Sequence, residues 1–508
     1  MKQCLNILML ILAFKLNGQP PSNRYISPLF QSVSETTNVL FSSNVPKPVP
    51  GGGFYEWLTG LPLNAREYQF TNVNLRMNIF QPSGDTLSKR PLVIVCFGGG
   101  FLNGSKDHWS IRLIAQELAK RGFVTAVIDY RLGMHVFNEE LSKRAVYRGV
   151  QDGRSAVRFF KADAAGANIY KVDPDQIYIG GHSAGAFIAT HNAYMDKEAE
   201  RPPSTMVWPQ GSNTCPDQLC LDCVGNNTSY SGHAKAVFSL AGALGFTSYM
   251  ETANDPKIVM FHSQDDDTVP YNSGEPFGSV SGFIVGFDLP TVYGSLPMSQ
   301  RADVINLPDQ FNSYIDRGHS VHEQSSTTLY TDIIPGISNW FNDQLLKPVA
   351  HPIDGKAYVC ASFPTVDYST IQSQAAYYQW EVIGGTILTN NPNNHTISVQ
   401  WNITAPSHEI KLTPYSKWDS KGATATKAIS ISPTFNNVWQ SNNGSWIETN
   451  NWSLVQLPES CHHIIFTDKT VPTLVTVPNT VVSEIKSISV GTQVTLHINP
   501  LASITVID

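Results

Sequence analysis

The pentapeptide Gly181-His182-Ser183-Ala184-Gly185 has the G-x-S-x-G spacing of a turn that presents a nucleophilic serine. An apolar strand candidate, Gln176–Gly180 (QIYIG), runs directly into it, and an Ala-containing helix candidate, Ala186–Tyr194, follows. So sharp a turn needs small residues beside the serine, and it directs the serine Oγ outward above the sheet. The pattern predicts Ser183 as a nucleophile, with a purely structural turn as the alternative.

A serine hydroxyl needs a base to become a good nucleophile, and the base needs a carboxylate to orient it. On a strand-turn-helix of this kind the acid and then the histidine follow the serine along the chain. The loop His262–Tyr271 (HSQDDDTVPY) follows the apolar strand candidate KIVMF and contains three neighbouring aspartates. We assign the acid to Asp266 from its position relative to Val269-Pro270. Asp265 and Asp267 are then solvated charges, with cation ligands as the alternative.

The base is predicted to be His319, which lies downstream of the acid, follows Gly318 and precedes the last long helix candidate of this part. His322 is the alternative base. Two other histidines are expected to have no catalytic role: His182 packs beside the serine, and His262 begins the acid loop.

Three consecutive glycines follow the first buried strand candidate, in Phe97-Gly98-Gly99-Gly100-Phe101. Glycine lets the backbone approach a substrate closely and turn its N–H groups inward. We predict that the N–H groups of Gly99, Gly100 and Ala184 form an oxyanion hole for a tetrahedral intermediate. A plain turn or a phosphate-binding loop is the alternative, although G-x-x-x-x-G-K-[ST] and G-x-G-x-x-G with an acidic ribose contact are both absent.

The elements that must position these residues alternate between strands and helices. Apolar runs at 91–97 (PLVIVCF) and 123–129 (FVTAVID) are typical of strands buried on both faces. The alternation implies βαβ units and a mostly parallel sheet. The other elements predicted here are strands at 68–80, 176–180, 236–240 and 257–261 and helices at 110–121, 145–164, 186–194, 301–315 and 331–346.

These motifs together resemble the esterase/lipase branch of the α/β hydrolases, which includes hormone-sensitive-lipase-like carboxylesterases and feruloyl-esterase-like enzymes. The resemblance covers about residues 65–347 and rests on FGGGF, the stretch Asp129–Gly133 (DYRLG), GHSAG, DDDTVPY and Gly318-His319. It implies an α/β-hydrolase fold that hydrolyses a carboxylic ester through an acyl-enzyme and needs no cofactor. The alternatives are a serine peptidase of the prolyl-oligopeptidase type and a catalytically inactive binding protein on the same fold.

After Lys347-Pro348 the composition shifts to Gln, Asn, Thr and β-branched residues, which predicts all-β, sandwich-like modules at 355–428 and 429–508. The stretch Tyr378–Gly385 (YQWEVIGG), followed by Val399-Gln400-Trp401, resembles the PKD-like β-modules of secreted Bacteroidetes-type enzymes. The resemblance implies modules that space, stabilise or bind glycans. Together with an insertion at 196–232, these modules favour a bulky ester as the substrate, such as an acylated polysaccharide.

Residues 1–18 are predicted to be a cleaved signal peptide, because Lys2 precedes the short apolar run Leu5–Phe14. A buried N-terminal helix is the alternative. The signal makes this a secreted protein, with residues 19–64 as an N-terminal surface segment. No later run is long and apolar enough to cross a membrane.

Three of the seven cysteines, Cys215, Cys220 and Cys223, crowd an insertion at 196–232. In an exported protein this spacing favours a loop disulfide, and a zinc site that includes His233 is the alternative. Cys96 ends an apolar strand candidate and is predicted to be a buried free thiol. We therefore expect no metal site.

The net charge of -7 and the pI of about 6.0 give no electrostatic basis for binding nucleic acid or an anionic membrane surface. A length of 508 residues allows two to four domains. The sequence does not set an oligomeric state.

Overall fold

The computed structural model describes residues 23–206, 220–278, 286–389, 391 and 393–507. The chain forms two compact units, Met1–Leu346 and Lys347–Asp508. The predicted signal peptide and Cys215 lie outside the described residues. Among the helices that are described, none is both long and apolar enough to span a membrane.

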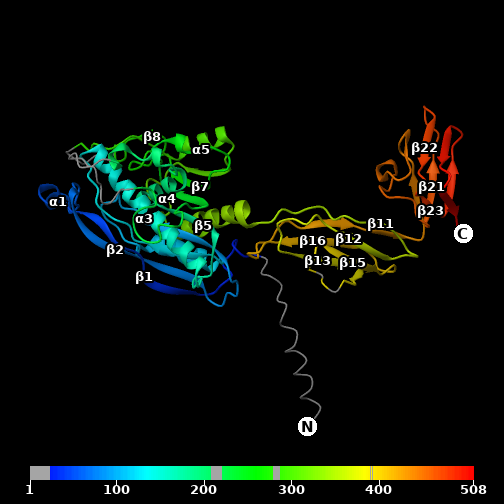
Figure 1. The fold of residues 1–508 in the computed structure, drawn as a ribbon, viewed down its shortest axis with the longest axis horizontal. Helices are drawn as coiled ribbons and strands as arrows, with labels where there is room; N and C mark the ends of the chain where they lie inside the picture. The colour runs from blue at the N-terminus through cyan, green and yellow to red at the C-terminus, as the bar shows by residue number, and fades with distance from the viewer. Residues whose placement is uncertain (1–22, 207–219, 279–285, 390, 392, 508) are drawn as a thin grey trace, which may run out of the picture. The chain divides into compact units, whose positions relative to one another are not determined.

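The first unit is built on an eight-stranded sheet (Figure 1) with the strand order β1-β2-β4-β3-β5-β6-β7-β10. The six strands from β4 to β10 in this order run parallel, whereas β1 and β2 pair antiparallel with their neighbours, so the predicted mostly parallel sheet is confirmed. The strands are β1 (Val33–Val49), β2 (Arg66–Pro82), β3 (Arg90–Cys96), β4 (Val124–Ile128), β5 (Val172–His182), β6 (Ala236–Leu240), β7 (Lys257–Ser263) and β10 (Asp309–Tyr314).

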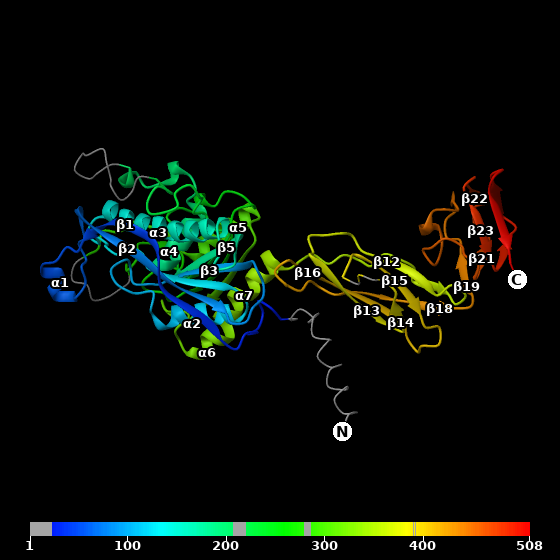
Figure 2. The same ribbon diagram turned by 60° about the horizontal axis from the view of Figure 1, so that its bottom comes forward.

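Helices cover both faces of this sheet, with α3 and α4 on one face and α2 and α7 on the other (Figure 2). All residues of β3, β4 and β6 are therefore buried, as their apolar runs predict. The helices and short strands of this unit are α1 (Phe54–Thr59), α2 (Trp109–Lys120), α3 (Glu139–Ala165), α4 (Ala184–Tyr194), β8 (Ser273–Gly274), β9 (Val292–Tyr293), α5 (Ser295–Ile305), α6 (Ser326–Thr328) and α7 (Ile334–Phe341).

Two segments of the first unit differ from their sequence-based predictions. The helix predicted at 301–315 is wrong: α5 ends at Ile305, the next residue, Asn306, has a left-handed φ of 56°, and β10 follows. Pro308 prevents the helix from continuing, and the next residues pair in parallel with β7. The predicted surface segment 19–64 contributes β1, a 17-residue edge strand of the sheet.

The second unit begins with two three-stranded antiparallel sheets, ordered β12-β15-β14 and β13-β16-β17. Alternate residues of these strands meet in one core that includes Trp380, Val399 and Trp401. The strands are β11 (Tyr358–Cys360), β12 (Thr365–Ser369), β13 (Tyr377–Ile383), β14 (Gly385–Ile387), β15 (Thr396–Trp401), β16 (Glu409–Tyr415), β17 (Ala425–Ala428) and β18 (Ser430–Ser432).

The last block of the second unit pairs its strands in parallel, in the orders β19-β21-β24, β20-β22-β25 and β23-β26. Consecutive strands join different sheets, so the chain winds around a common core. The predicted β structure is confirmed, but the parallel pairing differs from the antiparallel sheets of a sandwich. The strands are β19 (Phe435–Val438), β20 (Asn443–Ser445), β21 (His462–Phe466), β22 (Thr473–Val477), β23 (Val482–Ile485), β24 (Ser487–Val490), β25 (Val494–Ile498) and β26 (Ser503–Val506).

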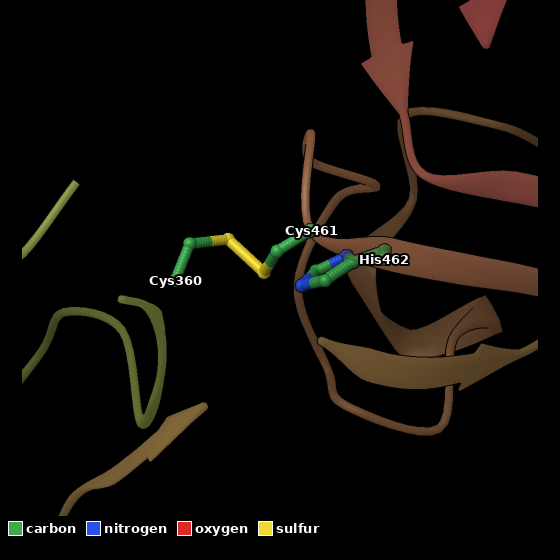
Figure 3. Close-up of side chains that lie close together, drawn as sticks. All are labelled: Cys360, Cys461 and His462. Carbon is green, nitrogen blue, oxygen red and sulfur yellow. A yellow bond between two sulfur atoms is a disulfide. The ribbon is translucent and has the colours of Figure 1, made fainter. Parts of the chain in front are cut away.

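Two disulfides are present among the described cysteines. Cys220–Cys223 closes a short loop in the insertion, as predicted, and Cys360–Cys461 links β11 to the residue before β21, with the His462 ring beside it (Figure 3). Cys96 is a fully buried free thiol, as predicted, and burial raises its pKa.

Candidate active site

Ser183 occupies the sharp turn between β5 and α4, with φ of 52° and ψ of -120°. A side chain in this left-handed region is strained, and such strain is typical of functional positions. The flanking glycines let the turn pack against the end of β3. A Cβ at Gly181 would lie 2.3 Å from the Cys96 carbonyl oxygen, and one at Gly185 would lie 2.2 Å from the same atom. The small residues of G-x-S-x-G are thus a steric requirement.

The structure brings Ser183, His319 and Asp266 together. The Ser183 Oγ lies 2.9 Å from His319 Nε2, and His319 Nδ1 lies 2.9 Å from Asp266 Oδ2. The histidine comes from the loop after β10, and the aspartate from the loop after β7. Since β5, β7 and β10 are parallel strands of one sheet, their carboxyl ends meet at the same edge and deliver the three side chains to one place.

The Asp266 carboxylate is fully buried and receives hydrogen bonds on both oxygens. Its Oδ1 accepts from the backbone N–H groups of Thr268 (2.9 Å) and Val269 (2.8 Å). Burial alone would raise the pKa of Asp266, but hydrogen bonds from His262 and His319 outweigh it and hold that pKa well below its usual value. The carboxylate therefore stays ionised and fixed in orientation.

The neighbouring aspartates take other positions. Asp265 accepts from the Ser263 hydroxyl and, at 3.1 Å, from the Gly318 N–H, while Asp267 accepts from the Thr268 hydroxyl at 2.9 Å. Both residues are exposed, as predicted. Asp265 helps to hold the backbone that leads into His319.

His262 is a functional candidate that the sequence reasoning missed. It is fully buried, and its Nε2 lies 3.1 Å from Asp266 Oδ2, while its Nδ1 lies 2.9 Å from the Ser295 hydroxyl. When Ser295 donates to Nδ1, the Nε2–H points at the carboxylate. The available signal was its position at the end of a buried strand, four residues before the aspartate.

The alternative base, His322, does not lie where it could accept the Ser183 proton. Its Nε2 lies 3.2 Å from the Ser110 hydroxyl, and it has no hydrogen bond to Ser183 or Asp266. Burial and the neighbouring His108 and His319 lower its pKa to about 3, so it remains neutral.

His182 packs beside the serine, as predicted. Its Nε2–H donates to the His319 carbonyl oxygen at 3.1 Å, and its ring lies 4.8 Å from the His319 ring between centroids. Burial, with smaller effects of His322 and His319, holds the pKa of His182 well below its usual value. A neutral His182 adds no positive charge beside the base.

The three glycines after β3 lie against the serine. A Cβ at Gly98 would be 3.3 Å from the Ser183 Cβ, and Gly99 and Gly100 have positive φ values of 125° and 59°. Within the described part of the chain, no protein acceptor takes the N–H of Gly99, Gly100 or Ala184. These donors are therefore available to a bound oxygen.

A cavity of about 830 Å³ is lined on one side by Phe187 and His191 of α4. Its wall includes Tyr147, Met195, Tyr249 and Tyr293, and none of the three predicted catalytic residues.

The fold follows from three observations together: the strand order, the position of Ser183 directly after β5, and the helices on both faces of the sheet. The first unit has the α/β-hydrolase fold. Residues 77–252 match the BD-FAE family model, and this range includes Ser183 and the three glycines Gly98–Gly100 (the glycine loop).

Curated relatives match over part of the chain. Gut esterase 1 of Caenorhabditis briggsae is 30% identical over 149 residues, which are 27% of this chain and 26% of the relative. Neuroligin-like protein glit-1 of Caenorhabditis elegans is 33% identical over 114 residues, 22% of this chain and 15% of that protein. A probable isoprenylcysteine alpha-carbonyl methylesterase of Oryza sativa subsp. japonica is 25% identical over 244 residues, 40% and 50% of the two chains. The chain thus spans half or less of the length of each.

Solved structures align more broadly at lower identity. Propionate-bound esterase 2 of Thermogutta terrifontis is 19% identical, with 55% of this chain and 92% of that chain covered and a TM-score of 0.37. A truncated carbohydrate esterase from gut microbiota is 15% identical, with 64% and 99% covered and a TM-score of 0.38.

Proposed function

We propose that this chain is a secreted serine hydrolase that cleaves carboxylic esters through an acyl-enzyme. One observation carries the proposal: the continuous hydrogen-bonded chain from the Ser183 hydroxyl through His319 to the buried, ionised Asp266. A serine, a base and an orienting acid in this order along an α/β-hydrolase chain are the groups that acyl transfer requires.

In the first half of the reaction, the Ser183 Oγ attacks the ester carbonyl carbon while its proton passes to His319 Nε2. The N–H groups of Gly99, Gly100 and Ala184 stabilise the negatively charged oxygen of the tetrahedral intermediate. His319 then donates the proton to the departing alkoxide, and the alcohol leaves. Asp266 keeps Nδ1–H of the imidazole in place throughout.

In the second half, water attacks the acyl-serine and gives its proton to His319. Collapse of the second intermediate releases the carboxylic acid and returns the proton to Ser183. The balance is one ester and one water consumed for one acid and one alcohol, with no other reactant.

The substrate class is proposed to be a bulky ester, such as an acylated polysaccharide. A β-rich second unit supports this, since the hydrolysis of a small soluble ester does not need one. Secretion is supported by the two disulfides, because such bonds persist in oxidising compartments. A screen of acetylated xylan, feruloylated sugars and triglycerides beside simple short-chain esters tests the substrate class, and equal turnover of the simple esters and the polymers would contradict it.

The hydrolysis of p-nitrophenyl acetate tests the reaction. We expect turnover by the wild type and a loss of about 10⁴-fold or more in kcat for Ser183→Ala. The control is Ser326→Ala, at an exposed serine of α6, which should retain full activity. Equal rates for wild type and Ser183→Ala would contradict the proposal, and cleavage of peptides without cleavage of esters would favour a peptidase.

A further inference from the structure

Phe277 has a backbone conformation that bulky residues rarely adopt. Its φ is 61°, in the left-handed region, where a side chain other than glycine is strained. Its N–H donates to the Thr268 carbonyl oxygen at 2.6 Å, within the loop that carries Asp266. Because strain of this kind persists only where the surroundings impose it, a role for the ring at this position is indicated.

The Phe277 ring lies against the glycine loop. A Cβ built on Gly100 would meet the Phe277 Cζ at 3.3 Å, which makes this ring the nearest neighbour on that side of Gly100. The Gly100 N–H is one of the proposed oxyanion donors. The ring therefore lies beside the backbone segment that would hold the carbonyl oxygen of a substrate.

Two further rings hold Phe277 in place. It packs edge to face on Phe287 with centroids 6.0 Å apart, and Phe287 packs in the same way on Phe137, again at 6.0 Å. All three rings are half-buried, so each keeps an accessible part. These contacts support the Phe277 ring on one side.

We propose that Phe277 is a specificity-determining residue that limits the size of the acyl group. The inference rests on the proposed ester hydrolysis. The carbonyl oxygen belongs to the acyl part of the ester, which stays beside the proposed oxyanion donors after the alcohol has left, so we assign the acyl group to the space beside Phe277. Short, unbranched acyl groups fit there, whereas branched or aryl acyl groups collide with the ring.

The test compares kcat/KM for p-nitrophenyl acetate, butyrate, pivalate and benzoate in wild type and Phe277→Gly. Glycine accepts the left-handed φ without strain, so this change removes the ring and keeps the backbone. We expect the pivalate-to-acetate and benzoate-to-acetate ratios to rise about tenfold or more, which is the range that hydrophobic pockets achieve. Acetate hydrolysis should change only a few-fold.

Phe277→Leu serves as the intermediate variant and should raise both ratios less. Phe246→Ala is the control, because Phe246 is an exposed ring of the 830 Å³ cavity, whose wall includes neither the glycine loop nor Phe277. It should leave the ratios unchanged.

Acetate turnover and thermal unfolding show whether each variant is folded. Unchanged ratios in a folded Phe277→Gly would overturn the inference. A loss of benzoate activity alone would also overturn it, because the ring would then bind aryl groups rather than exclude them. A series of acetates with methyl, butyl and naphthyl alcohols forms the second arm. A gain confined to that series would overturn the acyl assignment. If the wild type cleaves no ester, the proposed function fails instead.

Discussion

The two units are stabilised by different means. The first unit buries charged side chains, many of them on α3, which carries five such residues: Arg144, Arg148, Asp152, Arg154 and Arg158. In the described part of the second unit, no Asp, Glu, Lys or Arg side chain is buried. Its cores are aromatic and aliphatic, and a disulfide joins residues 101 positions apart.

The difference separates the chemical sensitivities of the units. In the first unit, Arg131 Nε lies 2.9 Å from Asp152 Oδ1 with both side chains buried, so either charge becomes unpaired if its partner is removed. In the second unit, Trp439 and Trp446 pack edge to face on Trp452 with centroids 4.9 and 5.0 Å apart. Charge and pH should act mainly on the first unit, and reduction mainly on the second.

The largest expected effect is on catalysis, confined to the first unit. In Asp266→Asn the side chain can no longer accept from His319 Nδ1–H with both oxygens, so the imidazole loses its required tautomer. We expect kcat to fall about 10⁴-fold, measured with p-nitrophenyl acetate. Asp267→Asn, at an exposed neighbour, is the control and should stay within about twofold. A similar loss in both variants would mean that the loop, and not the Asp266–His319 pair, was disturbed.

The disulfide Cys360–Cys461 gives the next largest effect. Replacing both cysteines by alanine frees a loop of 101 residues in the unfolded chain, and we expect the second unit to lose about 4–5 kcal/mol. Hydrogen exchange measured by mass spectrometry reports each unit separately. The matched control is the Cys220–Cys223 pair, a three-residue separation in the first unit. If the removal of the Cys220–Cys223 disulfide destabilises the second unit as much as the removal of Cys360–Cys461, the comparison between the units is wrong.

A buried ion pair gives the third effect. Asp152→Ala leaves the fully buried Arg131 guanidinium without its carboxylate, and we expect the first unit to lose about 3–5 kcal/mol. The Asp152 oxygens also accept from the Arg131 backbone N–H at 2.7 Å, so the loop after β4 loosens as well. Urea unfolding, monitored through the enzymatic activity, measures the decrease in the free energy of unfolding. A change below about 1 kcal/mol would show that the pair does not stabilise the unit.

Low pH is expected to have the smallest effect on stability for each titrating group. His191 and His322 in the first unit and His462 in the second are buried, and burial, as the largest cause, lowers the pKa of each to about 4, about 3 and about 4 respectively. His182 in the first unit is shifted in the same direction. Below about pH 6.5 the unfolded chain binds protons that the folded chain does not. The free energy of unfolding therefore decreases as the pH is lowered, by up to about 1.4 kcal/mol per pH unit for each group.

The first unit has three such histidines and the second has one. We therefore expect the free energy of unfolding of the first unit to decrease more steeply as the pH is lowered from about 6 to about 4.5. Hydrogen exchange of each unit across this range measures the two slopes. Equal slopes, or a steeper one in the second unit, would contradict the comparison.

The sequence predicts most of the first unit because its signals are local. Apolar runs at 91–97 and 123–129 give strands, and the small residues around Ser183 are forced by the 2.2–2.3 Å approach of the turn to Cys96. The order of serine, acid and histidine then selects Asp266 and His319 as candidates.

The remaining features depend on contacts between distant residues. β1 and β10 are strands because they pair with β2 and β7, and no local pattern states this. The parallel winding after Phe435 depends on strands of three to five residues that pair across turns. His262 and Phe277 have ordinary sequence surroundings, and their contacts with Asp266 and Gly100 exist only once the loops are folded.

Covalent labelling tests the central claim most directly. A fluorophosphonate reacts with an activated serine and stays bound, so mass spectrometry of the intact protein and of its peptides gives the number of labels and their position. We expect one label per chain, on the peptide that contains Ser183. Under the same conditions we expect no label in Ser183→Ala or in His319→Ala. A label on another residue, or ester hydrolysis by a protein whose Ser183 remains unlabelled, would contradict it.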